Sequence, residues 1–188
     1  MYAKVTSAGL LGMNAFIVQV ETDLSRGMPS FETVGLPDAA VKESRDRVRA
    51  ALRNTGFEVP AAKITVNLAP ADLHKTGPIY DLPIYLSLLM ASGSTQASFD
   101  DAIFLGELAL DGTVRRISGA LPMTIMAAEK GYKRIFLPED NAAEASVVHG
   151  IEVYGVHSAL EVVDFYEGLK PLTPHPPLEF APASEGSY

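Results

Sequence analysis

Apolar and polar residues follow two different periods along this chain, which predicts a mixture of strands and helices. Residues 64–68 (Ile-Thr-Val-Asn-Leu) alternate at every position, as in a strand with one buried face. Residues 81–92 are instead apolar over most of their length, which indicates a buried helix. Further strands are predicted at residues 15–20, 31–34, 102–105, 107–110, 113–117, 134–137 and 152–154, and further helices at residues 38–54, 120–130, 140–147 and 158–169. The expected fold class is α/β.

Short polar signals predict where several of these elements begin and end. Asp38 is expected to cap the helix over residues 38–54, and Asp81 to cap the next one. Asp111-Gly112 is the preferred dipeptide of a two-residue hairpin turn, here between two predicted strands. Gly131 follows a predicted helix and is expected to terminate it.

The length of 188 residues suits one hydrophobic core with a tail. From Pro171 the composition changes, because residues 171–188 hold five of the 13 prolines and no Lys or Arg. We therefore predict a domain over residues 1–170 and an extended linker over residues 171–188. A linker connects two modules, so we expect the natural protein to continue beyond it.

Composition and missing motifs exclude several kinds of site. The chain has no cysteine, which excludes disulfides, thiolate nucleophiles and cysteine-bound zinc, and its four histidines lack zinc-site spacing. Neither G-x-x-x-x-G-K-[ST] nor G-x-G-x-x-G occurs, so this segment is not expected to bind ATP. No apolar run is long enough for a membrane span and no signal peptide is present, so we expect a cytoplasmic protein with no membrane partner.

A formal net charge of −8 argues against a surface covered by nucleic acid, yet it leaves room for a local basic face. Four cations of the predicted helix over residues 38–54 fall on one face, within about 80° on the helical wheel. They are Lys42, Arg45, Arg49 and Arg53. Such a face suits phosphate contacts. The alternative is a solvated surface in which Glu43, Asp46 and Arg47 form pairs at helical spacing.

Three runs of the sequence resemble a known bacterial family. The run V-G-L-P-D-A-A-V-K-E-S-R-D-R-V-R-A-A-L over residues 34–52, I-T-V-N-L-A-P-A-D over residues 64–72 and D-L-P-I over residues 81–84 are similar to the N-terminal domain of the ComM/YifB family. These are Mg-chelatase-like AAA+ ATPases, and the likeness continues in order from residue 2 to about residue 169. The resemblance implies that the linker leads into an ATPase module, absent here, that uses ATP and Mg²⁺ and assembles as a hexamer.

That N-terminal domain is in turn similar to the proteolytic domain of Lon, which implies a ribosomal protein S5 domain 2-like α+β fold. Residues 74–81 resemble Lon's nucleophile motif P-K-D-G-P-S-A-G, and residues 106–121 resemble the later stretch that carries its lysine. By this match Ile79 stands at the position of the catalytic serine and Leu121 at that of the catalytic lysine. Neither side chain supplies a nucleophile or a base, so no peptidase activity is expected. Ser118 with Lys75 is the one nearby pair that offers a substitute.

The resemblance implies a non-catalytic domain of a helicase-like motor that moves branched DNA during natural transformation and recombination. By analogy with a similar domain of the recombination motor RadA, it is expected to serve ring assembly and to contact single-stranded or branched DNA. The residues expected to bind DNA are Lys42, Arg45, Arg49, Arg53, Arg115 and Arg116. The alternative is an adaptor domain with no DNA binding, in which an apolar groove at Ile79 and Tyr80 holds a peptide or a neighbouring subunit.

Overall fold

The computed structural model describes residues 1–179, so residues 180–188 of the predicted linker lie outside the described part. Seven strands form one mixed sheet in the order β3-β4-β2-β1-β5-β8-β9. They are β1 (Tyr2–Leu11), β2 (Asn14–Ser25), β3 (Ser30–Val34), β4 (Lys63–Ala69), β5 (Ala102–Phe104), β8 (Arg134–Pro138) and β9 (Glu152–Val156). β2 runs antiparallel to both of its neighbours, whereas every other neighbouring pair in this sheet is parallel. The predicted α/β class is confirmed.

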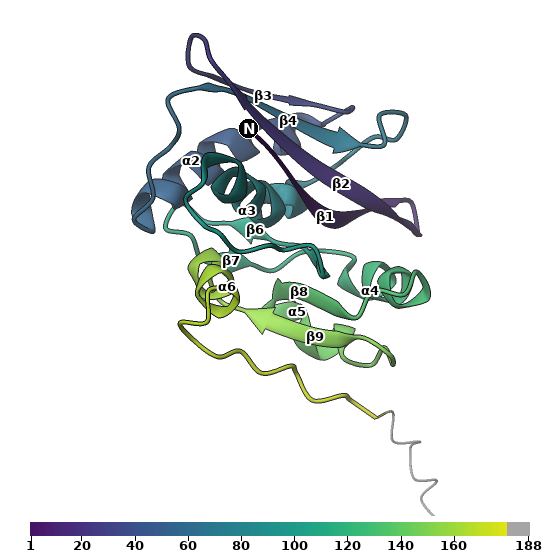
Figure 1. Ribbon diagram of the computed structural model, residues 1–188. Coiled ribbons are helices and arrows are strands. Elements are labelled where there is room, and N and C mark those ends of the chain that lie inside the picture. The colour runs from purple at the N-terminus through teal and green to yellow at the C-terminus, as the bar shows by residue number, and fades with distance from the viewer. Residues whose placement is uncertain (180–188) are drawn as a thin grey trace, which may run out of the picture.

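Helices cover the sheet in two groups (Figure 1). The helical segments are α1 (Ala39–Lys42), α2 (Ser44–Asn54), the 3-10 turn η1 (Pro78–Tyr80), α3 (Asp81–Ser92), α4 (Ala120–Glu129), α5 (Glu139–Ala145) and α6 (Ala159–Tyr166). α3 packs on β1 and β2, and α2 packs on α3, next to the N-terminal strands. α5 and α6 pack on β9 near the other end of the sheet. None of the helices within residues 1–179 is long and apolar enough to cross a membrane.

The predicted hairpin is present as a separate small element, but the prediction of a two-residue turn is wrong, because residues 109–113 separate its two short strands. β6 (Glu107–Leu108) pairs antiparallel with β7 (Val114–Arg115), and the Asp111-Gly112 turn lies between them. Gly112 has a φ of 89°, a conformation in which a side chain would be strained. Asn54 Nδ2 of α2 donates to the carbonyl oxygen of Leu110 over 2.8 Å. The hairpin is thereby anchored to the C-terminal end of α2.

The predicted helix over residues 38–54 is divided into α1 and α2 at Glu43. Its expected N-cap is confirmed, because Asp38 Oδ1 accepts a hydrogen bond from the Val41 amide over 2.8 Å. The prediction for Asp81 is wrong. η1 runs directly into α3, so Tyr80 occupies the N-cap position and Asp81 lies inside the helix. Its carboxylate is fully buried and accepts hydrogen bonds from other elements instead.

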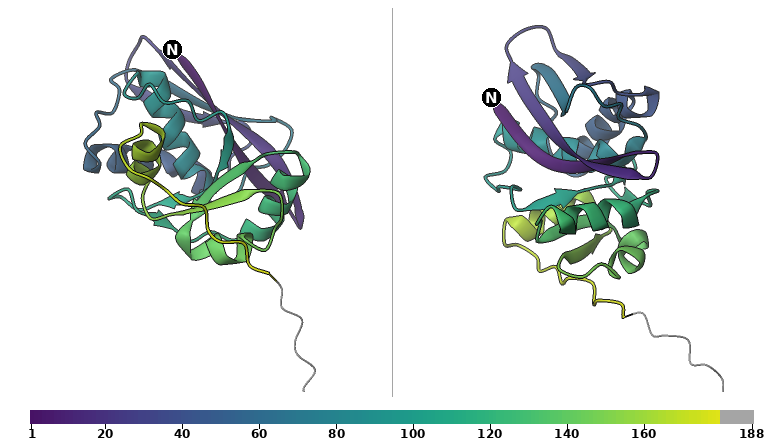
Figure 2. Two further views of the ribbon diagram at one scale, coloured as in Figure 1. Left: turned by 60° about the horizontal axis from the view of Figure 1, so that its bottom comes forward. Right: turned by 90° about the vertical axis from the view of Figure 1, so that its right-hand side faces the viewer.

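The described part of the predicted linker lies against the domain. The amide of His175 donates to the carbonyl oxygen of Val153 in β9 over 2.6 Å, and that of Leu178 to the carbonyl oxygen of Ser146 over 3.2 Å. Leu172 packs against the hydrophobic core. Figure 2 shows this yellow segment passing along the green strands before it leaves the domain. Residues 171–179 therefore associate with the β9 edge of the sheet.

Candidate functional site

The two segments that resemble the Lon catalytic motifs meet at one cavity of about 370 Å³. Ile79 of η1 lines it together with Leu10 of β1 and with four polar residues. The polar residues are Thr76, Glu107, Arg116 and Ser118. The folded chain thus brings together residues that lie about forty positions apart, as the resemblance implies.

Apolar side chains stand at the two positions that match the catalytic serine and lysine of Lon. The Ile79 side chain is 9% exposed and has no atom that ionises or attacks a carbonyl. Leu121, in the first turn of α4, is half-buried and does not line the cavity. Tyr80, expected beside Ile79 in an apolar groove, also does not line it and is 1% exposed. The groove expected at Ile79 and Tyr80 is therefore a cavity of mixed polarity that excludes Tyr80.

The substitute pair of Ser118 and Lys75 is not formed. Lys75 is completely buried, and its Nζ donates to the carbonyl oxygens of Gly35, over 2.7 Å, and Pro70. Within residues 1–179 no hydrogen bond joins Lys75 to Ser118. Burial lowers the pKa of Lys75, although the nearby Asp72 carboxylate opposes that shift. The lysine therefore holds two loops together beside β3 and β4 rather than facing the cavity.

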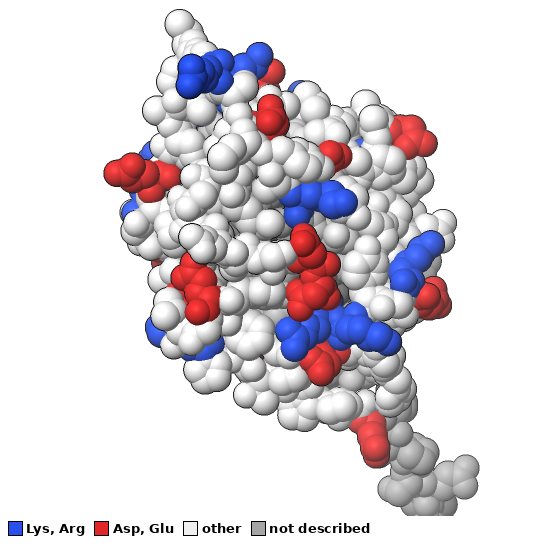
Figure 3. All heavy atoms as spheres, viewed as in Figure 1, with Lys and Arg blue, Asp and Glu red and all other residues white. Residues whose placement is uncertain are grey.

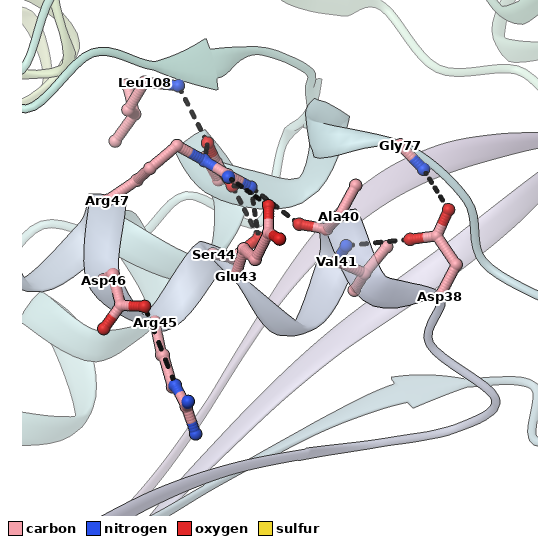
Figure 4. A network of polar contacts seen from close by, with 11 residues as sticks. Asp38, Ala40, Val41, Glu43, Ser44, Arg45, Asp46, Arg47, Gly77 and Leu108 are labelled. Carbon is pink, nitrogen blue, oxygen red and sulfur yellow. Dashed lines mark hydrogen bonds and ion pairs between the residues drawn. The ribbon is translucent and has the colours of Figure 1, made fainter.

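A buried ion pair connects α2 to α3 (Figure 4). Arg47 Nε donates to Asp81 Oδ2 over 2.6 Å, and its Nη2 donates to Asp81 Oδ1 over 3.1 Å. Ser44 Oγ donates to Asp81 Oδ1 over 2.5 Å, and the Leu108 amide donates to Asp81 Oδ2 over 3.0 Å. Each carboxylate oxygen thus accepts two hydrogen bonds. Burial raises the pKa of Asp81, whereas the donations from Arg47, Ser44 and Leu108 oppose that rise.

The sequence did not reveal this network. Glu43 and Arg47 do form the expected surface pair, at 3.7 Å between Oε2 and Nη1. The Arg47 side chain is nevertheless only 18% exposed, because its guanidinium also donates to Asp81 and to the carbonyl oxygen of Ala40. The network joins α1, α2, α3 and β6, so it fixes the frame around the cavity.

The outer face of α1 and α2 carries the four predicted cations in three different settings. Lys42 and Arg53 are exposed, and Arg45 is exposed with Nε 3.9 Å from Asp46 Oδ2. Arg49 is partly buried, with its guanidinium 5.3 Å from the centroid of the Phe31 ring. Lys42 and Arg45 also border a second cavity beside β3. The predicted face exists, but its members do not share one environment.

The hairpin cations lie elsewhere. Arg115 and Arg116 are both exposed, and Arg116 lines the first cavity. Because the hairpin is anchored at Asn54, Arg53 belongs to the same end of the molecule. On the face seen in Figure 3, basic and acidic side chains are interspersed. Within residues 1–179 no three Asp, Glu or His side chains come together as a metal-ion site.

Comparison with known families agrees with this geometry. The family model described as subunit ChlI of Mg-chelatase matches residues 20–141. The chain belongs to the ChlI family. This match covers more than half of the chain and includes β3, α2, α3 and every residue that lines the cavity except Leu10.

Individual relatives confirm the predicted resemblance. The chain is 44% identical to Competence protein ComM of Haemophilus influenzae over 90% of its own length and 33% of the relative. It is 46% identical to the protein YifB of Escherichia coli over 78% of its length and 29% of the relative. It is 30% identical to a mitochondrial Lon protease homolog of Neurospora crassa over 85% of its length and 15% of the relative. The chain thus spans about a third of the length of ComM and YifB.

Proposed function

We propose that this chain is the non-catalytic domain of a Mg-chelatase-like AAA+ ATPase that acts on DNA, and that it serves ring assembly and DNA contact. Its similarity to a relative named as a competence protein supports a role in DNA uptake or recombination. Because the chain spans only a third of that relative, ATP and Mg²⁺ would bind in the remainder of the protein. The hexamer would form there too, with this domain beside the ring, in the cytoplasm where the chromosome lies.

The main support for a domain without peptidase activity is that Ile79 lines the cavity at the position of the Lon nucleophile. Hydrolysis by a serine–lysine pair needs a hydroxyl and an amine within hydrogen-bond reach of each other. Ser118 and Thr76 supply hydroxyls at the cavity, but none of the residues that line it is a lysine or a histidine. The buried Lys75 is held by two carbonyl oxygens. The cavity therefore lacks the base that a serine–lysine hydrolase requires.

The exposed cations support DNA contact. Of the six residues expected from the sequence, Arg53, Arg115 and Arg116 are exposed and belong to the end of the molecule where the hairpin meets α2. Lys42, Arg45 and Arg49 lie nearer β3, where Asp46 and Phe31 already contact two of them. We therefore assign the main phosphate contacts to Arg53, Arg115 and Arg116, which lie together near the hairpin and form no ion pair within residues 1–179. Each phosphate that such a cation neutralises releases a counterion condensed on the DNA.

A peptidase assay tests the non-catalytic part. The purified chain is incubated with a fluorescently quenched, unfolded protein substrate, and cleavage is followed against a blank. We expect no cleavage above the blank, and no difference between the wild type and Ser118→Ala. Cleavage by the wild type that is lost in Ser118→Ala would show an active nucleophile and overturn the proposal.

A further inference from the structure

The two edges of the seven-stranded sheet differ in what covers them. β9, at one edge, receives a backbone hydrogen bond from the segment over residues 171–179. β3, at the opposite edge, pairs only with β4 within the described residues (Figure 1). An edge strand presents a row of N–H and C=O groups that another strand can pair with. The outer edge of β3 is therefore available to pair with a further strand.

A groove follows this open strand. A cavity of about 230 Å³ is lined on one side by the four consecutive residues 31–34 of β3. Lys42 of α1 and Arg45 of α2 line the other side. Because consecutive strand residues form one wall, the groove runs along the strand direction. A strand edge facing a helical wall is the geometry in which domains add a peptide to their own sheet.

The charge of the groove narrows the choice of occupant. Lys42 and Arg45 are exposed cations, and the guanidinium of Arg49 lies over the Phe31 ring at the same strand. Glu32 is the one acidic residue among those that line the groove. The net charge of the residues that line the groove is positive, so carboxylates of a bound segment would form ion pairs with Lys42 and Arg45. Glu32 and the alternating backbone groups of β3 suit a peptide better than a row of phosphates.

We propose that β3 is a docking edge for an extended, acidic peptide segment of a protein partner, which adds to the sheet as a further strand. Backbone hydrogen bonds to β3 would supply affinity, and pairing with Lys42 and Arg45 would select acidic side chains. The β3 groove shares no lining residue with the cavity at Ile79, and peptide docking there does not depend on DNA contact.

The probe is a synthetic peptide of alternating Thr and Glu, because Thr favours the extended conformation and alternation places every Glu on one face. The same peptide with Lys in place of Glu is the control. NMR titration of the whole chain follows binding, and amide hydrogen exchange follows β3. We expect the acidic peptide to bind and to slow exchange at the β3 amides that do not bond to β4. Strand addition produces that protection, whereas loose electrostatic binding does not.

Charge reversal supplies the second test. The double variant Lys42→Glu, Arg45→Glu should lose roughly tenfold or more in affinity for the acidic peptide and gain affinity for the basic one. The matched double variant Lys130→Glu, Lys133→Glu makes the same charge change at exposed positions near the other half of the sheet and should leave affinity unchanged. Equal thermal unfolding midpoints show that both variants fold. The proposal is overturned if the acidic peptide does not bind, if it binds without protecting β3, if both double variants behave alike, or if a DNA oligonucleotide and not the peptide shifts the β3 resonances.

Discussion

Arg45 and Arg47 lie two positions apart on α2 and have opposite environments. Arg45 has a side chain that is 55% exposed, and its nearest charge is the neighbouring Asp46. Arg47 points to the other side of the helix, where it meets the fully buried Asp81 (Figure 4). Two residues advance an α-helix by about 200°, so such neighbours necessarily face opposite ways. One basic helix thus supplies both a structural cation, Arg47, and cations that are available to partners.

The same contrast recurs in the segment that leads to the cavity. Lys75 is completely buried, whereas His74 and Thr76 on either side are exposed. Inward cations are expected to determine stability and outward cations to determine binding. Three substitutions and one pH dependence test that division, in order of decreasing effect on stability.

Arg47→Ala should destabilise the domain most, by about 3 to 5 kcal/mol, because it leaves the Asp81 carboxylate buried without its cation. Arg45→Ala should change the free energy of unfolding by less than about 0.5 kcal/mol, since its side chain is exposed. Chemical denaturation of both variants measures the difference. Similar losses in the two variants would contradict the assigned inward and outward roles.

Lys75→Met should cost about 2 to 3 kcal/mol, because it removes a charged donor from the carbonyl oxygens of Gly35 and Pro70 and keeps a side chain of similar length. His74→Ala, at the exposed neighbouring position, is the matched control and should be nearly neutral. Denaturation midpoints compare the two. A neutral Lys75→Met would mean that the buried ammonium contributes nothing to folding.

Ser44→Ala should cost about 1 to 2 kcal/mol, because Asp81 Oδ1 loses one donor but keeps Arg47. The effect should disappear in a chain that already carries Asp81→Leu with Arg47→Met, since residue 81 then has no oxygen to accept the hydrogen bond. A double-mutant cycle on the free energy of unfolding measures this coupling. Strict additivity would show that Ser44 acts independently of the network.

The pKa of Lys75 predicts the smallest effect, a dependence of stability on pH. Burial lowers this pKa in the folded chain, so over the alkaline range below the ordinary lysine value the unfolded chain binds more protons at Lys75. Its contribution to the free energy of unfolding therefore rises with pH in that range. The buried tyrosines act in the opposite direction above their ordinary pKa, and burial raises the pKa of Tyr85 to about 12. The tyrosines contribute equally to wild type and to Lys75→Met, so they cancel in the difference between the two free energies of unfolding. This difference should grow as pH rises from neutral. A difference that stays constant with pH would contradict the lowered pKa of Lys75.

The local pattern of apolar and polar residues predicted most strands and helices of this fold. It missed features that depend on contacts between residues far apart in the sequence. The strand at residues 64–68 and the helix over residues 81–92 follow from alternation and from continuous apolar character. β1 was not predicted, because residues from Val5 to Gly9 are all buried and include Thr6 and Ser7, which breaks any alternation of apolar and polar positions. A strand covered on both faces gives no period of two.

The candidate site depended even more on contacts between distant residues. Asp81 lies 37 positions from Ser44 and 34 from Arg47, so no local signal could show that it is a buried acceptor and not a helix cap. The place of Ile79 followed from the resemblance to Lon, and the cavity that it lines followed only from the fold. The open edge at β3 likewise depends on strand order, which the sequence pattern did not provide.

The most direct test of the proposed role is the salt dependence of binding to forked DNA, measured by fluorescence anisotropy with molar mass determined alongside by light scattering. With Arg53, Arg115 and Arg116 at phosphates, the logarithm of affinity should fall with the logarithm of salt concentration with a slope of about −3. Arg115→Glu with Arg116→Glu should reduce that slope by about 2, whereas Lys130→Glu with Lys133→Glu should leave it unchanged. Absence of binding at low salt, or equal slopes in both double variants, would contradict DNA contact by this domain and favour the adaptor alternative.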